Sequence, residues 1–175
     1  YVVKTALKES VSLETSSSYD IDLILKLYEH GALNKDATIL HNGIKTDEYL
    51  KKIRLLQHQD FKRTIIILDS VQELERITTQ KLDKPIKIGL RISIDEEPQA
   101  AYYTSRLGIN KQELLELVND KIQTNTFLEL HMIHFFVDSG INDNLYYWGE
   151  LKKAIQLYTQ IKKIVPSLQA LNSGG

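Results

Sequence analysis

Short apolar runs alternate with amphipathic stretches along the whole chain, and this alternation limits the possible folds more than any other feature. Several runs are rich in isoleucine and nearly continuous, as in Ile65-Ile66-Ile67-Leu68. A strand buried on both faces has this composition, because both of its alternating sets of side chains contact a core. The pattern therefore predicts parallel strands, which we place at residues 11–13, 37–40, 64–68, 86–92, 128–135 and 168–171.

The stretches between these runs repeat apolar residues with the period of a helix, and several carry start or stop signals. Ser17 or Ser18 is placed to cap one helix, and Asn110, with Glu113 three residues later, is placed to cap another. Gly31 occupies the position that follows a helix C-terminus, and Pro166 ends a helix through residues 151–164. Each strand is thus followed by a helix, which predicts an α/β fold.

Parallel strands joined by helical crossovers form either an open doubly wound sheet or a (β/α)8 barrel, and periodicity does not separate the two. Six strands are predicted, whereas a closed barrel needs eight, so a barrel here would be partial. The chain has 175 residues, of which 42% are hydrophobic, which is enough for one domain with a substantial core.

Composition excludes several classes of site and partner. There is no cysteine, so disulfides and cysteine metal sites are excluded, which fits a reducing cytoplasm. The net charge of −1 gives no field that favours nucleic acid or an acidic surface. No apolar run approaches the roughly 20 residues that span a bilayer. We therefore expect a cytoplasmic protein without nucleic-acid or membrane partners.

In both α/β architectures ligands bind at the carboxyl ends of the strands, so the polar residues after each run are the candidate site residues. Glu14 and the hydroxyl residues after it could meet a cofactor, although a helix cap is the commoner use of such a segment. His41 and Lys45 could act as acid, base or anion ligand, or could flank a turn built on Asn42-Gly43.

Arg91 lies inside an apolar series, where a partly buried guanidinium needs an anionic or carbonyl partner. That partner is either a ligand or a neighbouring carboxylate, Asp95 or Glu96, and the residue types do not decide between them.

The fifth run and the chain end supply further candidates. His131 and His134 lie three residues apart and so on opposite faces of a strand, which argues against a metal pair, and no metal site is predicted. His134 and Phe136 point the same way. Ser139 in the tip 138–140 and the pair Gly174-Gly175 could bind a phosphate through hydroxyl and backbone N–H groups, or could form an ordinary turn and a frayed end.

Taken in order, these segments resemble the fold-type III pyridoxal-phosphate decarboxylases, the group of ornithine, diaminopimelate and arginine decarboxylases that is related in fold to alanine racemase. The resemblance spans essentially the whole chain and implies a partial (β/α)8 barrel of the alanine racemase-like kind, with about six of eight strands. The matching phrases are Leu13-Glu14-Thr15-Ser16-Ser17, Asn42-Gly43-Ile44-Lys45, Gly89-Leu90-Arg91-Ile92, Ser105-Arg106-Leu107-Gly108-Ile109, His134-Phe135-Phe136-Val137-Asp138-Ser139-Gly140 and Asn172-Ser173-Gly174-Gly175.

The biosynthetic arginine decarboxylases are the most similar branch. Glu14 stands where ornithine decarboxylases carry aspartate, and the phrases at 103–108 and 146–148 also match. The resemblance implies the cofactor pyridoxal 5'-phosphate and a reaction that converts arginine to agmatine and CO₂ for polyamine biosynthesis. It also implies a homo-oligomer, because active sites in this family form between two subunits. Diaminopimelate, ornithine or carboxynorspermidine decarboxylation, racemisation, and a non-catalytic regulatory paralogue remain alternatives.

The resemblance also implies the residues that contact the cofactor. Glu14 would lie near the cofactor and its lysine, and Arg91 would hydrogen-bond the cofactor or neighbouring side chains. Phe136 stands where many relatives place a histidine that stacks on the pyridine ring, and its ring can stack but cannot titrate. His134 would lie beside it, and the phosphate would be held by Ser139, Gly174 and Gly175. Asp138 replaces a usual glycine.

The two ends of the chain carry separate expectations. Tyr1-Val2-Val3-Lys4 mimics the family's Tyr-x-x-Lys strand, but only ten residues separate Lys4 from Glu14, against nearly twenty in relatives. We therefore expect Lys4 on a surface helix and the Schiff-base lysine upstream of Tyr1. The β-rich second domain would follow Gly175, so residues 1–175 are expected to be a partial barrel domain that is inactive alone.

Overall fold

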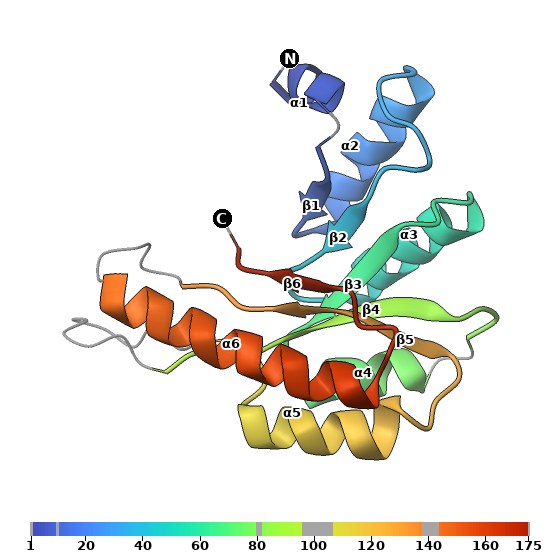
Figure 1. Ribbon diagram of the computed structural model, residues 1–175. Coiled ribbons are helices and arrows are strands. Elements are labelled where there is room, and N and C mark those ends of the chain that lie inside the picture. The colour runs from blue at the N-terminus through green and yellow to red at the C-terminus, as the bar shows by residue number, and fades with distance from the viewer. Residues whose placement is uncertain (1, 10, 80–81, 96–106, 138–143, 175) are drawn as a thin grey trace. The chain divides into compact units, whose positions relative to one another are not determined.

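The computed structural model describes residues 2–9, 11–79, 82–95, 107–137 and 144–174, in which strands and helices alternate (Figure 1). The strands are β1 (Leu13–Thr15), β2 (Ile39–His41), β3 (Thr64–Leu68), β4 (Ile86–Arg91), β5 (Leu128–His134) and β6 (Ala170–Asn172). The helices are α1 (Val2–Ala6), α2 (Ser18–Glu29), α3 (Asp47–His58), α4 (Val71–Thr78), α5 (Lys111–Leu117) and α6 (Asn144–Ile164), with a 3-10 turn at Leu7–Glu9 and a π-helical turn at Val118–Ile122.

The six strands follow one another in the sheet in their chain order, β1-β2-β3-β4-β5-β6. The pairs β1–β2, β2–β3, β4–β5 and β5–β6 are parallel. A doubly wound sheet reverses its strand order at a switch point, whereas a (β/α)8 barrel adds each strand beside the last. The sequential order therefore confirms the prediction of a partial barrel with six of its eight strands.

Three predicted strands were placed two residues too early at their start. The structure has them begin at Leu13, Ile39 and Ala170 rather than at residues 11, 37 and 168. In the first strand the reason is a polar interaction: the Thr15 side chain is buried and donates to the Leu40 carbonyl oxygen at 3.2 Å, so the hydroxyl segment continues the strand. Leu168 is fully buried, but it lies in the turn before β6.

The chain divides into two compact units, Tyr1–Ile66 and Ile67–Gly175, with the boundary inside β3. In the first unit α2 and α3 lie side by side and cover one face of β1 and β2 (Figure 1). The helices bury the residues that face the strands, and the exposure of each is 5% or less. These residues are Ile21, Ile24 and Leu27 of α2 and Tyr49, Leu50, Ile53 and Leu56 of α3.

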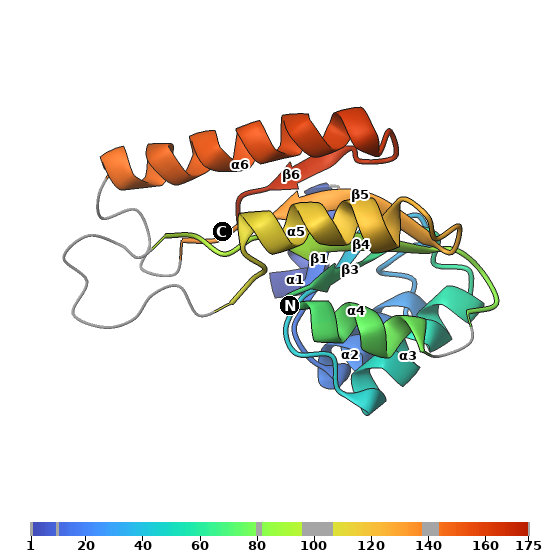
Figure 2. The ribbon, with the colours of Figure 1, turned by 90° about the horizontal axis from the view of Figure 1, so that it is seen from below.

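The second unit holds the last two residues of β3, strands β4–β6 and helices α4–α6. Helix α6 runs alongside β6 (Figure 2). Its buried residues Ala154, Leu157 and Ile161 follow the helical period that the sequence predicts. Strand β4 shifts register between Ile88 and Gly89, where a Cβ on Gly89 would lie 2.5 Å from the Ile67 side chain. No helix among the described residues is both long and apolar enough to cross a membrane.

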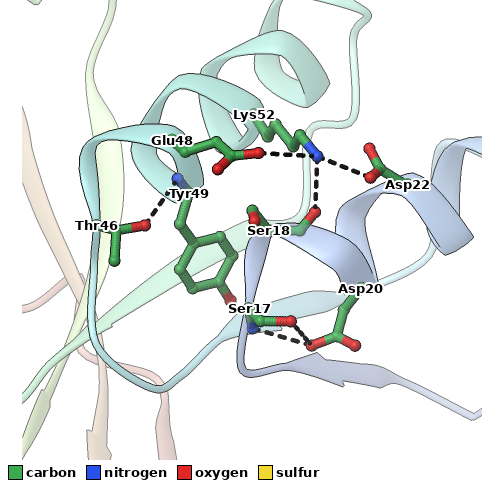
Figure 3. Close-up of polar contacts among 8 residues, drawn as sticks. All are labelled: Ser17, Ser18, Asp20, Asp22, Thr46, Glu48, Tyr49 and Lys52. Atoms are coloured by element: carbon green, nitrogen blue, oxygen red, sulfur yellow. Dashed lines mark hydrogen bonds and ion pairs between the residues drawn. The ribbon is translucent and has the colours of Figure 1, made fainter.

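Helix ends in the first unit are fixed by local polar contacts. Ser17 caps α2, as one of the two predicted alternatives had it, and the Asp20 carboxylate accepts from the Ser17 amide at 2.9 Å (Figure 3). Although burial acts to raise it, hydrogen bonds from Ser16 and Ser17 lower the pKa of Asp20 below its ordinary value. Thr46 caps α3 by accepting from the Tyr49 amide. Lys52 joins α3 to α2 through Asp22 at 2.7 Å (Figure 3).

Helices α2 and α3 are each followed by a residue in the left-handed conformation. Gly31 follows α2 with φ +66°, as predicted, and the Ala32 amide donates to the Leu27 carbonyl oxygen. Asp60 takes the same position after α3 with φ +72°, and the Phe61 amide donates to the Leu56 carbonyl oxygen. The second helix therefore uses a non-glycine residue in a conformation that favours glycine.

Candidate cofactor-binding site

In the second unit the predicted residues lie at the carboxyl ends of neighbouring strands. Arg91, His134 and Asn172 are register partners across β4, β5 and β6. Backbone hydrogen bonds continue past the strand ends: the Ile92 amide donates to the His134 carbonyl oxygen at 2.8 Å, and the Phe135 amide donates to the Asn172 carbonyl oxygen at 2.9 Å. The segments that carry Arg91, Phe136 and Gly174 are therefore held next to one another.

Arg91 pairs with Asp69, which is not a partner that the sequence predicted. A guanidinium nitrogen lies 3.6 Å from an Asp69 carboxylate oxygen, and the two side chains are only 12% and 9% exposed. Asp69 follows β3, the strand next to β4 in the sheet, so this pair spans adjacent strand ends. The prediction of Asp95 was wrong, because Asp95 instead forms an ion pair with Lys153 of α6. Glu96 lies outside the described residues.

Phe136 lies close to two other candidates of this unit, Arg91 and Gly174. The guanidinium carbon of Arg91 lies 5.9 Å from the centroid of the Phe136 ring, within the range of a cation–π contact. Gly174 has φ +71°, and a Cβ at this position would overlap the Phe136 ring. The Gly174 amide donates to the Asn172 side-chain oxygen at 2.9 Å. A side chain at position 174 is therefore excluded by both backbone conformation and space.

His134 is buried, with 1% of its surface exposed. Ser139, Gly175 and Asp138 lie outside the described residues, so their predicted relation to a phosphate stays a prediction.

In the first unit Glu14 is the middle residue of β1, and its side chain is exposed. One carboxylate oxygen accepts from the Asn42 side-chain amide at 2.9 Å. Asn42 follows β2, and its backbone amide donates to the Thr15 carbonyl oxygen at 2.8 Å. Glu14 thus lies within β1 rather than after it, and its predicted contact with the cofactor stays a prediction.

A buried polar network lies beneath Glu14. The Thr15 hydroxyl lies 2.8 Å from His41 Nδ1 and 2.6 Å from the Tyr49 hydroxyl, and all three residues are at most 3% exposed. Tyr49 also donates to the Thr15 carbonyl oxygen at 2.9 Å. Burial, with smaller contributions from Asp20 and Glu14, raises the pKa of the Tyr49 phenol, although its hydrogen bond with Thr15 opposes the shift.

His41 and Lys45 flank a turn built on Asn42-Gly43, which is one of the two alternatives that the sequence left open. Burial, and secondarily the positive charge of Lys45, lowers the pKa of His41 to about 3, so its imidazole is neutral at pH 7. Lys45 is 1% exposed and donates to the Gly43 carbonyl oxygen at 2.6 Å. Gly43 has φ +77°, and a Cβ there would lie 2.5 Å from the Ser16 carbonyl oxygen. Asn42-Gly43 is therefore a tight turn packed against the end of β1.

Lys4 is an exposed residue of α1, which confirms the prediction of a surface helix at this position.

The described residues fit a phosphorylated aromatic cofactor in their chemistry. The second unit offers an aromatic ring, a nearly buried guanidinium and a glycine with no room for a side chain, which together suit stacking and a close backbone approach to an anion. The first unit offers an exposed carboxylate held at one oxygen. Sequence reasoning missed Asp69 and Tyr49. Asp69 carried a usable signal, because it is an acid directly after a predicted strand.

Comparison with known proteins identifies one family over the whole chain. The pyridoxal binding domain of the pyridoxal-dependent decarboxylases matches residues 1–175. Among curated proteins, the biosynthetic arginine decarboxylase of Prochlorococcus marinus strain MIT 9312 is 23% identical over 181 residues, covering 99% of this chain and 27% of that protein. The chain thus spans about a quarter of the length of the curated relatives it matches.

Solved structures show the same fold. The biosynthetic arginine decarboxylase of Campylobacter jejuni is 24% identical with a TM-score of 0.69, and the match covers 96% of this chain and 27% of that one. The diaminopimelate decarboxylase of Helicobacter pylori, complexed with L-lysine, is 19% identical with a TM-score of 0.73, and the match covers 97% of this chain and 42% of that one.

Proposed function

Because this chain belongs to the pyridoxal-dependent decarboxylases and is their pyridoxal-binding domain, we propose that the full-length protein removes the α-carboxylate of arginine, with pyridoxal 5'-phosphate as cofactor. The observation that carries the proposal is the family match over residues 1–175. We propose arginine rather than another basic amino acid because the curated relatives are named biosynthetic arginine decarboxylases. The products would be agmatine and CO₂, a step toward polyamines, in a cytoplasmic homo-oligomer.

On this proposal, each of the predicted site residues has a separate role toward the cofactor. The ring of Phe136 stacks on the pyridine ring, and Arg91, held by Asp69, places positive charge beside Phe136. The backbone at Gly174 leaves room for the phosphate, which Ser139 and Gly175 also bind. His134 packs at the same strand end, and Glu14 presents its carboxylate to the cofactor. When bound, pyridoxal 5'-phosphate would supply an electron sink for the loss of CO₂ from the α-carbon.

Phe136 has a further consequence for pH dependence. An imidazole at this position would change charge near neutral pH, whereas a phenyl ring carries no charge at any pH. On this proposal, the side chain at position 136 therefore adds no titration of its own to the pH dependence of cofactor binding.

The test is a substrate comparison on the full-length protein saturated with pyridoxal phosphate. Release of CO₂ is measured with L-arginine, L-ornithine, meso-diaminopimelate and carboxynorspermidine at equal concentrations. We expect arginine to give the highest kcat/KM, by at least about tenfold. A higher kcat/KM for another of these substrates would replace arginine as the proposed substrate. If none of them released CO₂, the decarboxylase proposal would be overturned in favour of a non-catalytic paralogue.

Gly174→Ala tests the site assignment in the same protein. The added methyl group would overlap the Phe136 ring and would be strained at φ +71°, so we expect cofactor binding to weaken by at least about tenfold. Gly149→Ala is the matched control, because a Cβ at Gly149 in α6 meets no atom within 4 Å. Equal cofactor affinity in both variants, measured by absorbance titration, would place the phosphate elsewhere.

A further inference from the structure

The Glu14 carboxylate is held by one side chain. Its oxygen Oε1 accepts from Asn42 Nδ2 at 2.9 Å, and no described residue donates to its other oxygen. Glu14 is exposed, and a solvent-facing glutamate has several rotamers of similar energy. The contact with Asn42 selects one of them and leaves the second oxygen available.

The orientation of the Asn42 amide is fixed by its own neighbours. Its oxygen Oδ1 accepts from the Gly43 backbone amide at 2.9 Å, which only the oxygen end of the amide can do. The NH₂ group must therefore face Glu14. The same residue is tied through its backbone, because its carbonyl oxygen accepts from the Tyr49 hydroxyl at 3.2 Å and its amide donates to Thr15.

The buried network beneath makes this arrangement stiff. Tyr49 is fully buried, and its one hydroxyl proton is shared between the carbonyl oxygens of Thr15 at 2.9 Å and Asn42 at 3.2 Å, at the ends of both strands. The Asn42-Gly43 turn also packs against the Ser16 carbonyl oxygen. Backbone positions at the ends of β1 and β2 are thus locked together before either side chain meets a ligand.

We propose that Asn42 is a positioning residue, whose side-chain amide orients the Glu14 carboxylate toward the cofactor. The inference rests on the proposed function, since it assumes that Glu14 faces pyridoxal phosphate. Asn42 acts only through Glu14 and does not itself contact the cofactor.

The experiment compares four forms of the full-length protein: wild type, Glu14→Gln, Asn42→Asp and the double variant. Asn42→Asp keeps the oxygen that accepts from Gly43 but replaces the donor with a second carboxylate facing Glu14. The double variant restores a hydrogen bond between the two positions with donor and acceptor exchanged. The readouts are the dissociation constant of pyridoxal phosphate, the pH midpoint of its bound absorption band, and the melting temperature.

We expect Asn42→Asp to weaken cofactor binding by about threefold to tenfold and to shift the pH midpoint, because a charge-assisted hydrogen bond becomes a repulsive pair. The double variant should recover the melting temperature without recovering the affinity or the pH midpoint, because its carboxylate is at position 42. Recovery of all three readouts would show that the contact only ties the strands together, and would overturn the inference.

Two further variants separate the possible failures. Asn42→Leu removes the donor without adding charge, and Asn34→Leu is its control, because Asn34 accepts from the Asp36 amide in a loop before β2. If Asn42→Leu gives wild-type readouts while Glu14→Gln gives altered ones, only the positioning role of Asn42 is overturned. Wild-type readouts for Glu14→Gln would instead overturn the assignment of Glu14 to the cofactor site.

Discussion

At the scale of single residues, His41 makes a prediction about pH. Its folded-state pKa is about 3, whereas an unfolded histidine titrates near 6.5. Between these values the unfolded chain binds one proton more than the folded chain, so the free energy of unfolding falls as pH decreases from about 6.5 toward 3. The loss from this one group should approach about 1.4 kcal/mol per pH unit between pH 5.5 and 4.

His41→Asn checks this dependence. Asparagine can occupy the place of Nδ1 beside the Thr15 hydroxyl but does not titrate, so the variant should lose less stability than wild type on acidification. Urea denaturation of the full-length protein between pH 7 and 4 measures the difference. His58→Asn, which removes an exposed imidazole from the same unit, is the control. Parallel pH curves for wild type and His41→Asn would contradict the assignment.

At the scale of elements, the end of α3 is built less favourably than the end of α2. Asp60 has φ +72° where Gly31, at the corresponding position of α2, is a glycine. Asp60→Gly should therefore stabilise the protein by about 0.5–1 kcal/mol, because the left-handed conformation no longer costs strain. The urea midpoint of the full-length protein measures the gain.

Gln59→Gly supplies the comparison for this prediction. The neighbouring residue has φ −81°, where glycine relieves no strain and adds only unfolded-state entropy. Gln59→Gly should therefore lower the free energy of unfolding. A gain in both variants, or in neither, would show that the backbone conformation at Asp60 is not what limits the end of this helix.

Local signals explain which elements the sequence could predict. Strand β3 was placed correctly because four of its five buried residues form a continuous apolar run, and the caps at Ser17, Asn110 and Gly31 depend on near neighbours in the sequence. Strand ends were less accurate, since β1 continues into Thr15, whose burial depends on contacts from other elements.

The sequence proposed Glu14, Arg91 and Gly174 from their places near predicted strand ends, and the family resemblance added their roles toward the cofactor, which stay predictions. The partner of Arg91 was not predicted, because Asp69 lies 22 positions earlier and the pair forms only across adjacent strand ends. Tyr49 was missed for a similar reason: a tyrosine on a helix face gives no sign that its hydroxyl reaches Thr15, 34 positions away.

At the scale of the whole molecule, the sheet order places β1 and β6 at its two edges in the described part of the chain. An edge strand offers unpaired backbone donors and acceptors to any other strand. Expressed as a separate polypeptide, residues 1–175 should therefore self-associate, which sedimentation velocity at several concentrations would detect. A monodisperse monomer with a cooperative melting transition would show that these edges are already protected.

The Tyr49 hydroxyl also has a consequence for the time course of folding. It reaches back from α3 to a strand that was completed 34 residues earlier, so the end of β1 cannot acquire its final hydrogen bonds until the later helix has docked. Contacts that form this late are largely absent from the folding transition state, and losing one speeds unfolding more than it slows folding. We therefore expect the tip of β1, which carries Glu14, to gain its final hydrogen bonds late in the folding of its unit.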